Sequence, residues 1–343
     1  MAEAAGPSKP PRSKPLPVPV EPFLNPADDE ERTVHSVYEA IAPHFSQTRH
    51  KPWPLISSFL HSLPPDAIGL DSGAGNGKYL PVSRDAGLEM IALDRSGGLL
   101  EIARKENGGE CVRGDLGFDG WRRGVFDFAI SVAAIHHLST PLRRRQSVQV
   151  LLRPLKLSHS PPYSRFLIYV WAYEQGDLSK RKMGTAAKGD QSENESGLDG
   201  KKGERGKRAG SGEEKVQDVL VPWVLSAKKP PTSTKSVSKT KLSSLPSNEE
   251  TSAIKENNHP ADPASPPSPD STPPPPPQVF HRYYHLFVAG ELRDLVESAG
   301  VEEGFTIVAE GETPPPHRKW LRVKGEGWEA DNWWLEGEVG AEA

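Results

Sequence analysis

A glycine-rich loop that directly follows a short apolar segment constrains the fold of this chain more than any other feature. Residues 67–71 are predicted to form a buried strand, and the loop spans 71–78. Glycine lets the backbone turn tightly and lets a ligand approach the main chain closely. Dinucleotide-binding proteins use a similar turn, so the loop alone predicts a ligand site at a strand–helix junction and does not define the ligand.

Strand patterns and helix patterns alternate along the chain after this loop. Short apolar strands are predicted at 67–71, 89–94, 109–115, 126–132 and 165–171, with helices at 97–105 and 141–155. Strands that alternate with helices form a parallel sheet covered on both faces. We therefore expect an α/β fold of the Rossmann-like kind.

The composition divides the chain into ordered and disordered parts. The 343 residues include 35 Pro and 31 Gly, and many of the prolines fall in two places. We expect a disordered leader at 1–27 and a disordered insertion at 176–278, because both are poor in residues that a core can bury. An apolar island at 216–225 is expected to dock on the folded part. One domain would then consist of 28–175 and 279–343.

Further elements are expected at the two ends of this domain. Acidic residues from Asp28 onward predict a helix start, and Pro43 is expected to end or kink that helix. After the insertion, order is expected to return at 279–287, followed by a helix at 290–299 and strands at 305–308 and 331–335.

The sequence argues against several classes of protein. No apolar stretch approaches the roughly 18 residues needed to cross a membrane, and 1–22 lacks the apolar core of a secretory signal. The one cysteine, Cys111, excludes a disulfide scaffold and a zinc site built from cysteines. The net charge of −4 does not by itself indicate a nucleic-acid binder. We expect a cytoplasmic protein, which could also enter the nucleus, with no membrane association and no metal ion.

An acidic residue ends each of the first three predicted strands. These residues are Asp71, Asp94 and Asp115, and Leu116 follows the last of them. The carboxyl ends of parallel strands line one crevice. Asp71 suits a cationic amino-acid group, and Asp94 suits two ribose hydroxyls. Asp115 and Leu116 suit an adenine, so the ligand with all three parts is S-adenosylmethionine. The alternative is that each aspartate only caps the helix that follows it.

Segments spread over most of the predicted ordered chain carry a resemblance to a known family. They are 34–54, 75–80, 94–96, 127–131 with 135–137, 168–172 with 174–175, 217–223, and 280–285. These segments resemble the wobble-uridine tRNA methyltransferases, which complete 5-methoxycarbonylmethyluridine in the anticodon loop. The family includes the fungal stand-alone enzyme and the methyltransferase domain of the animal AlkB-type tRNA hydroxylase.

The resemblance implies a class I S-adenosylmethionine-dependent methyltransferase with an antiparallel last strand. It also implies methyl transfer to the carboxylate of 5-carboxymethyluridine at the wobble position of the tRNA anticodon loop, with a small zinc-binding activator subunit as partner. The residues expected to bind the cofactor are Asp71, Gly73, Gly75, Gly77, Lys78, Asp94, Arg95, Asp115, Leu116 and Ser131.

The implied acceptor determines what catalysis requires. A carboxylate is already ionised at neutral pH, so the reaction needs no general base. We expect catalysis by positioning instead. The residues expected to hold the carboxylate and the flipped base are Arg49, His136, Arg282 and Tyr283. The alternative interpretations are that Arg49 is an ordinary surface charge and that His136 has a structural role.

The chain departs from the family pattern at several points. Ser72 and Ala74 replace the usual hydrophobic residue and cysteine of the glycine-rich loop. The stretch 155–164 is longer than usual, and 311–330 looks inserted before the last strand. Two other functions stay open on the sequence: a small-molecule methyltransferase that uses the same cofactor, and a catalytically silent tRNA-binding or regulatory protein.

Overall fold

The computed structural model describes residues 15–21, 23–175, 216–225 and 277–342. Contacts divide the chain into two units. The first unit holds the described residues up to Trp223 and those from Val279 onward, and all residues of the site below belong to it. Of the second unit, Val224–Gln278, only 224–225 and 277–278 are described.

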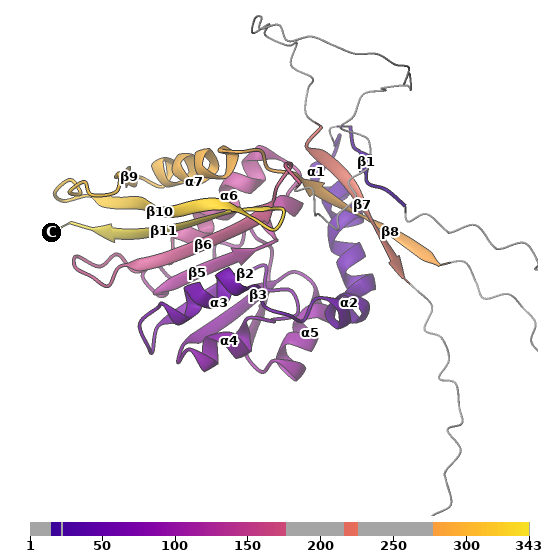
Figure 1. Ribbon diagram of the computed structural model, residues 1–343, viewed down its shortest axis with the longest axis horizontal. Coiled ribbons are helices and arrows are strands. Elements are labelled where there is room, and N and C mark those ends of the chain that lie inside the picture. Colours follow the sequence, from indigo (N-terminus) through magenta and orange to yellow (C-terminus); the bar gives the residue numbers. More distant parts are fainter. Residues whose placement is uncertain (1–14, 22, 176–215, 226–276, 343) are drawn as a thin grey trace, which may run out of the picture. The chain divides into compact units, whose positions relative to one another are not determined.

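Within the described residues, eight strands form one sheet in the order β4-β3-β2-β5-β6-β11-β10-β9 (Figure 1). They are β2 (Ile68–Ser72), β3 (Glu89–Asp94), β4 (Glu110–Arg113), β5 (Phe128–Val132), β6 (Ser164–Trp171), β9 (Thr306–Ile307), β10 (Lys319–Glu329) and β11 (Asn332–Ala341). Strands β4, β3, β2, β5 and β6 pair in parallel, and β11 runs antiparallel to both β6 and β10. The predicted α/β fold with a mainly parallel sheet is confirmed.

Helices begin the fold and connect its strands. They are α1 (Pro26–Glu30), the π-helical turn η1 (Glu31–His35), α2 (Ser36–Thr48), α3 (Pro54–His61), α4 (Leu80–Asp85), α5 (Gly97–Glu106), the 3₁₀ turn η2 (Ile135–His137), α6 (Pro141–Leu152) and α7 (Glu291–Glu302). Two of them begin with a side-chain cap. Ser96 Oγ accepts the first-turn N–H of Leu99 at α5, and Thr140 Oγ1 accepts that of Arg143 at α6.

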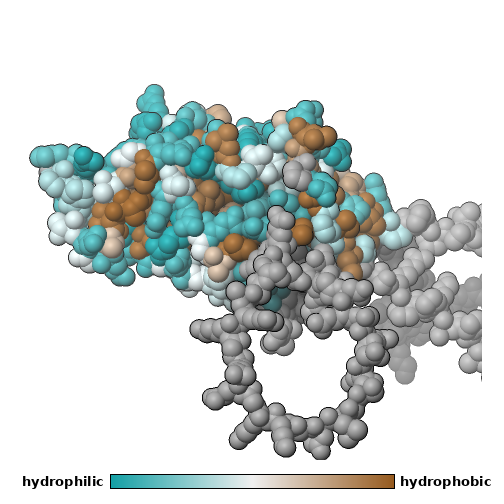
Figure 2. Space-filling view, turned by 90° about the horizontal axis from the view of Figure 1, so that it is seen from above, coloured by the Kyte–Doolittle hydropathy of each residue, from teal (hydrophilic) through white to brown (hydrophobic). Residues whose placement is uncertain are grey.

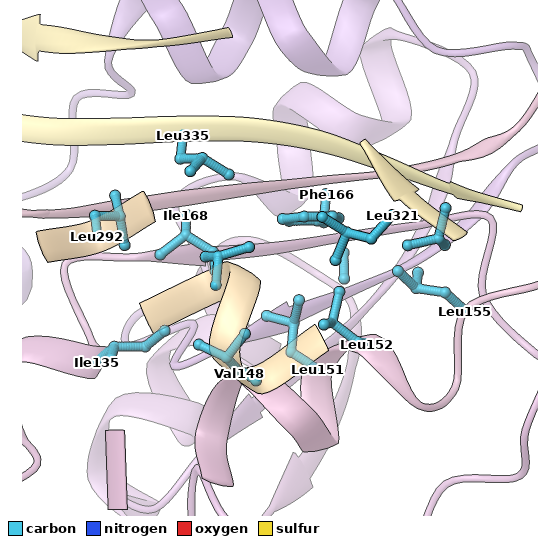
Figure 3. Packing of buried hydrophobic residues seen from close by; sticks show 14 of the residues in the cluster. Ile135, Val148, Leu151, Leu152, Leu155, Phe166, Ile168, Leu292, Leu321 and Leu335 are labelled. Atoms are coloured by element: carbon cyan, nitrogen blue, oxygen red, sulfur yellow. The ribbon is translucent and has the colours of Figure 1, made fainter. Parts of the chain in front are cut away.

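Two hydrophobic clusters pack on the two faces of the sheet. Alternation along β6 shows the division, because Phe166 and Ile168 belong to one cluster and Leu167 and Tyr169 to the other. The first cluster joins the sheet to α6 and α7, and Figure 3 shows its side chains converging between these helices and the strands. The second joins the sheet to α3, α4 and α5. The central strands are thus covered on both sides.

A small second sheet places part of the predicted insertion on the domain. It has the order β1-β7-β8, with β1 (Val18–Pro19), β7 (Asp218–Leu225) and β8 (Gln278–His285). β1 runs antiparallel to β7, with Val18 opposite Leu220. Val18 and Pro19 of the predicted leader are therefore paired, and helix α1 begins at Pro26, before the boundary predicted at Asp28. The predictions for 1–14, 176–215 and 226–276 lie outside the described residues.

Two segments differ from the simplest expectation. Of the two outcomes expected at Pro43, an end or a kink, the end is wrong, because α2 continues through Pro43 to Thr48 and packs buried Ile41 and Ala42. The stretch 311–330, which departs from the family pattern, holds most of β10. Its sequence hides the strand because Gly325 and Gly327 interrupt the apolar alternation; a Cβ at Gly327 would lie 3.1 Å from the indole nitrogen of Trp334.

Hydrophilic residues cover much of the face in Figure 2, and hydrophobic residues lie in separate groups among them. In the part of the chain that the structure describes, no helix is both long and apolar enough to span a bilayer. The same residues include no group of three or more His, Cys, Asp or Glu side chains placed to hold a metal ion.

The buried side chains of β10 generate a test of this fold. Leu321 is fully buried, so Leu321→Ala should lower the free energy of unfolding by about 2–5 kcal/mol through lost contacts and a residual cavity. The same change at Leu142, which is 54% exposed, should cost within about 0.5 kcal/mol. Urea unfolding of both variants measures the difference. Equal losses would contradict the placement of β10 in the core.

Candidate functional site

A cavity of about 460 Å³ opens at the carboxyl edge of the parallel strands. The loops after β2, β3, β4 and β5 line one side of it, which is where parallel α/β sheets bind ligands. The other side comes from the first helical segment, the end of β6, and β8. Hydrogen bonds at this site join residues that are 99 and 246 positions apart in the chain.

The glycine-rich loop is shaped by close contacts that side chains would block. Gly73 has φ +89°, and a Cβ there would lie 2.3 Å from the Cβ of Ala134. Gly73 and Gly75 line the cavity, as predicted for a loop that a ligand approaches closely. Gly77 does not line it, since a Cβ at this position would lie 2.7 Å from that of Ala103 in α5. Gly77 therefore lets helix and loop pack closely and is not a contact of the cavity.

Asp71 is a buried carboxylate that faces the cavity without a partner. It is 1% exposed, and neither carboxylate oxygen has a hydrogen bond among the described residues. Burial raises the pKa of Asp71 to about 7, although the nearby Lys78 acts in the opposite direction. A buried acceptor of this kind is costly unless a ligand satisfies it. The α-ammonium of an amino acid fits, because it supplies both charge and N–H donors.

Lys78 places a positive charge at the same end of the cavity. Its Nζ lies 4.4 Å from the ring centre of Trp53, and burial lowers the pKa of Lys78 to about 8. Lys78 remains mostly charged at neutral pH and lies close enough to Asp71 to influence its titration. A carboxylate and an ammonium side by side complement the ammonium and carboxylate of an amino acid. This end of the cavity therefore fits the methionine part of S-adenosylmethionine.

Asp94 organises the loop around the middle of the cavity. Its Oδ2 accepts the N–H of Gly75 at 2.8 Å, and its Oδ1 accepts that of Ser96 at 2.9 Å. Burial raises the pKa of Asp94, and these backbone hydrogen bonds oppose the rise. Each carboxylate oxygen keeps a second lone pair, so Asp94 can still accept two ribose hydroxyls. The carboxylate would thus bind the ligand and hold the loop at the same time.

The third strand end lies beside two arginines. Asp115 binds Arg143 at 3.0 Å and Arg95 at 3.3 Å, and both Asp115 and Leu116 line the cavity. Arg95 also lines it but reaches outward to Glu31 at 2.7 Å. With both arginines on its carboxylate, Asp115 is held in place at the end of the cavity predicted to receive the adenine.

Two predicted site residues point elsewhere. Ser131 is buried away from the cavity, and its Oγ donates to the carbonyl of Ser72 at 2.8 Å, which ties β5 to β2. Tyr283 donates its hydroxyl to Asp218 at 2.5 Å and does not line the cavity. Side chains alternate along a strand, so Arg282 and Tyr284 face the cavity and Tyr283 cannot. Tyr284 is the aromatic residue that the prediction should have named.

Arg282 is a buried cation among aromatic rings. Its Cζ lies 4.6 Å from the ring centre of Trp223, 5.2 Å from that of Tyr284 and 5.6 Å from that of Tyr38. Its Nη1 donates to the Tyr38 hydroxyl at 3.1 Å, and its Nε has no hydrogen-bond partner among the described residues. No carboxylate of the described residues pairs with it. Arg282 is thus a cation ready for an anion from outside the chain.

The hydrogen bonds that connect Arg282, Tyr38 and His137 determine which atoms of the tyrosine and the histidine donate and which accept. His137 Nδ1 lies 2.8 Å from the carbonyl of Tyr283, which can only accept, so Nδ1 carries a proton. Burial lowers the pKa of His137 to about 3, so the ring is neutral and Nε2 accepts. The Tyr38 hydroxyl, 2.8 Å away, must donate to that nitrogen. Its oxygen is then available to accept from Arg282.

His136 lies against the same aromatic rings. It is fully buried, lines the cavity and stacks on Tyr284 with ring centres 4.9 Å apart. Its Nδ1 accepts the backbone N–H of Trp171 at 3.1 Å. The lone pair of Nδ1 is therefore engaged, and a neutral ring carries its proton on Nε2. His136 can donate a hydrogen bond but has no lone pair left to take a proton.

Arg49 reaches the rim of the cavity from the end of α2. Its side chain is exposed, lines the cavity and lies with Cζ 5.6 Å from the ring centre of Trp223. Arg49, His136 and Arg282 are thus brought together around one opening. Sequence reasoning missed Tyr38, His137 and Tyr284 as a connected group, although all three lie inside the segments that carry the family resemblance.

The match to known proteins agrees with this geometry. A family model described as a methyltransferase domain matches residues 70–156, which include the glycine-rich loop and the three aspartates at the strand ends. The parallel sheet and the cavity that fits S-adenosylmethionine point to the same class. The chain is an S-adenosylmethionine-dependent methyltransferase.

Full-length relatives define the particular family. The chain is 36% identical over 327 residues to the tRNA (carboxymethyluridine(34)-5-O)-methyltransferase of Saccharomyces cerevisiae, covering 90% of this chain and 96% of that protein. The protein of the same name from Schizosaccharomyces pombe is 33% identical over 309 residues, covering 90% and 97%. This chain belongs to the tRNA (carboxymethyluridine(34)-5-O)-methyltransferase family. Membership of this family argues against the two alternatives that the sequence left open, the small-molecule methyltransferase and the catalytically silent protein.

Solved structures are less similar. A methyltransferase in complex with the Haloferax volcanii Trm112 methyltransferase activator has a TM-score of 0.34 and 21% sequence identity, covering 42% of this chain and 62% of that chain. A TM-score this low supports no argument about function.

The unpartnered carboxylate of Asp71 has opposite consequences for stability and for binding. Its pKa rises from 3.8 to about 7 on folding, so the charged form destabilises the folded protein above pH 7. Asp71→Asn should therefore raise the free energy of unfolding of the cofactor-free protein, by up to about 4 kcal/mol at pH 8. The gain should shrink as the pH falls from 7 and vanish below about 4. Thermal melts at several pH values measure it.

The same variant should bind S-adenosylmethionine more weakly by about 1.5–3 kcal/mol, the usual contribution of a hydrogen bond to a charged group. Calorimetry at pH 8 measures this loss. A variant that is less stable than the wild type at pH 8 and binds the cofactor equally well would contradict the role given to Asp71.

Proposed function

We infer that this protein methylates the carboxylate of 5-carboxymethyluridine at the wobble position of tRNA and forms 5-methoxycarbonylmethyluridine. The cofactor supplies an electrophilic methyl group. A carboxylate oxygen of the nucleoside forms the new bond to that methyl carbon as the carbon–sulfur bond breaks, and the electron pair goes to sulfur. The protein binds both reactants and aligns them in one cavity.

The observation that carries this proposal is the buried guanidinium of Arg282. Burial of a cation without a carboxylate partner is costly, so such a group is expected where a ligand supplies the anion. The acceptor nucleoside supplies a carboxylate, and a guanidinium can bind a carboxylate with two parallel hydrogen bonds. Arg49 at the rim adds a second cation on the path of the substrate. The site thus recognises the charge that the reaction removes.

The two histidines support a reaction without a general base. His137 is neutral and its acceptor nitrogen is occupied by Tyr38. The acceptor nitrogen of His136 is occupied by the backbone of Trp171. Neither ring can take a proton without breaking a buried hydrogen bond. A nucleophile that is already ionised needs no such step.

We also propose a small zinc-binding activator subunit as partner, on the family resemblance. The described sheet ends at β4, which pairs with β3 on one side only, so a partner strand could extend it there. We further propose that the protein acts in the cytoplasm and also enters the nucleus.

The charge of Arg282 is testable by substitution. Arg282→Gln should lower kcat/KM for tRNA by about 10- to 100-fold, the equivalent of one charge-assisted hydrogen bond. Affinity for S-adenosylmethionine should change less than about twofold, because the side chain contacts the other reactant. Arg104→Gln, at an exposed position of α5, is the matched control.

The assay uses tRNA from a Saccharomyces cerevisiae strain that lacks its tRNA (carboxymethyluridine(34)-5-O)-methyltransferase, with mass spectrometry of the nucleosides. Wild-type turnover in the Arg282→Gln variant would contradict the role of Arg282 in binding the carboxylate. A wild-type protein that leaves this tRNA unmethylated, and does not restore the nucleoside when expressed in that strain, would overturn the proposed function.

The pH dependence distinguishes positioning from base catalysis. With cofactor saturating, the single-turnover rate should be flat between pH 6 and 8, because a free carboxylic acid titrates near about 4. His137 should not contribute, since its pKa lies at about 3. A rate that rises with an apparent pKa near 6.5–7 and loses this rise in His136→Ala would mean that a base acts. The carboxylate acceptor would then have to be given up.

A further inference from the structure

Trp223 brings the predicted insertion into contact with the active site. It belongs to β7, which is flanked in sequence by 176–215 and 226–276, segments outside the described residues. Its side chain is only 8% exposed. Sequence reasoning gave this island only a docking role, as an apolar patch that covers the domain. Its contacts indicate more than that.

Both guanidinium groups of the substrate clamp lie against the same indole. The Cζ atom of Arg282 is 4.6 Å from the ring centre of Trp223, and the Cζ atom of Arg49 is 5.6 Å from it. Both arginines line the cavity, whereas Trp223 does not. Trp223 therefore lies behind the cations and can act on the substrate only through them.

The indole is itself held firmly. Its Nε1 donates to His44 Nδ1 at 3.0 Å, and its ring centre lies 5.8 Å from that of Phe45. Both partners belong to α2, the helix that ends beside Arg49. β7 is anchored by Val219 and Val221, which pack in a buried cluster with Tyr284 of β8 and with Leu286. The ring thus joins the island, α2 and β8 at the point where the two cations converge.

The electrostatics explain why a ring is needed here. Arg49 and Arg282 carry like charges toward one site, and no carboxylate among the described residues is paired with either. An aromatic face attracts a guanidinium by its quadrupole, and more strongly when the pair is desolvated. It does so without neutralising the charge, as an aspartate would. The cations stay in place and remain available to an anion.

We propose that Trp223 is a positioning residue for methyl transfer, which holds Arg49 and Arg282 as a two-cation site for the carboxylate of the nucleoside. The proposal rests on the proposed function, since that function supplies the carboxylate. It makes the island of β7 a working part of the enzyme. The segment that carries β7 would then be required for turnover even where the fold and the cofactor site do not depend on it.

The first experiment compares two substitutions in the full chain. Trp223→Leu removes the quadrupole and should lower kcat/KM for tRNA about tenfold or more, with the dissociation constant of S-adenosylmethionine changed less than about twofold. Trp223→Phe keeps an aromatic face and should retain most of the activity. Trp328→Leu, at a 41% exposed position of β10, is the matched control and should behave like the wild type.

A second experiment avoids any loss of folding. Tryptophans with one to four ring fluorines, inserted at 223 by codon suppression, keep the shape of the indole and weaken its quadrupole stepwise. We expect log kcat/KM to fall with each fluorine while the melting temperature stays constant. A purely structural ring would give a flat series.

The outcomes separate the two proposals. A flat fluorine series, a fully active Trp223→Leu, or equal losses of turnover and cofactor affinity in Leu and Phe variants would overturn the role of Trp223 and leave the proposed function standing. A wild-type protein that does not methylate carboxymethyluridine-containing tRNA would overturn both.

Discussion

Parallel pairing of β2 with its two neighbours is the constraint on which the site depends. β3 and β5 flank β2 in parallel register, so the loops that follow all three strands emerge at one edge. The glycine-rich loop, Asp94 and the turn that carries His136 and His137 meet there although they are far apart in sequence. The residues that follow these strands line one cavity because the strands run in the same direction.

The site also depends on charged groups that are buried away from water. Asp71 and Arg282 are both buried; the carboxylate of Asp71 has no hydrogen-bond partner, and Arg282 has no paired carboxylate, among the described residues. Each is costly in the free protein, and each matches a charge on one of the two reactants: the cofactor's ammonium and the nucleoside's carboxylate. The same burial that lowers stability therefore selects two ligands of defined charge.

The sequence predicted the parts of the fold that depend on local signals. Glycine spacing and an acid at each strand end need only a strand and a turn, so the structure places Asp71, Asp94 and Asp115 around the cavity as expected. Strand register does not follow from such signals. The family segment at 280–285 pointed to Arg282 and Tyr283 together, but adjacent residues of a strand face opposite ways, and Tyr284 faces the cavity instead.

Contacts between distant segments lay beyond any local pattern. The hydrogen bond of Tyr38 to His137 spans 99 residues, and that of Arg282 to Tyr38 spans 244. β10 was missed for a related reason, because its glycines make room for the ring of Trp334, a residue of the paired strand. Each of these features depends on two segments that only the fold brings together.

The position of β7 in the sequence follows from the same logic. A substrate site made by β8, α2 and the β5–α6 turn needs its two arginines held in place, and β7 supplies the ring against which they lie from within a long insertion. The position of this ring must be set by contacts of β7 itself, because the chain on either side does not fix it by short connections. Val219 and Val221 in the apolar cluster, Gln217 on the carbonyl of Leu286, and Trp223 on His44 provide those contacts.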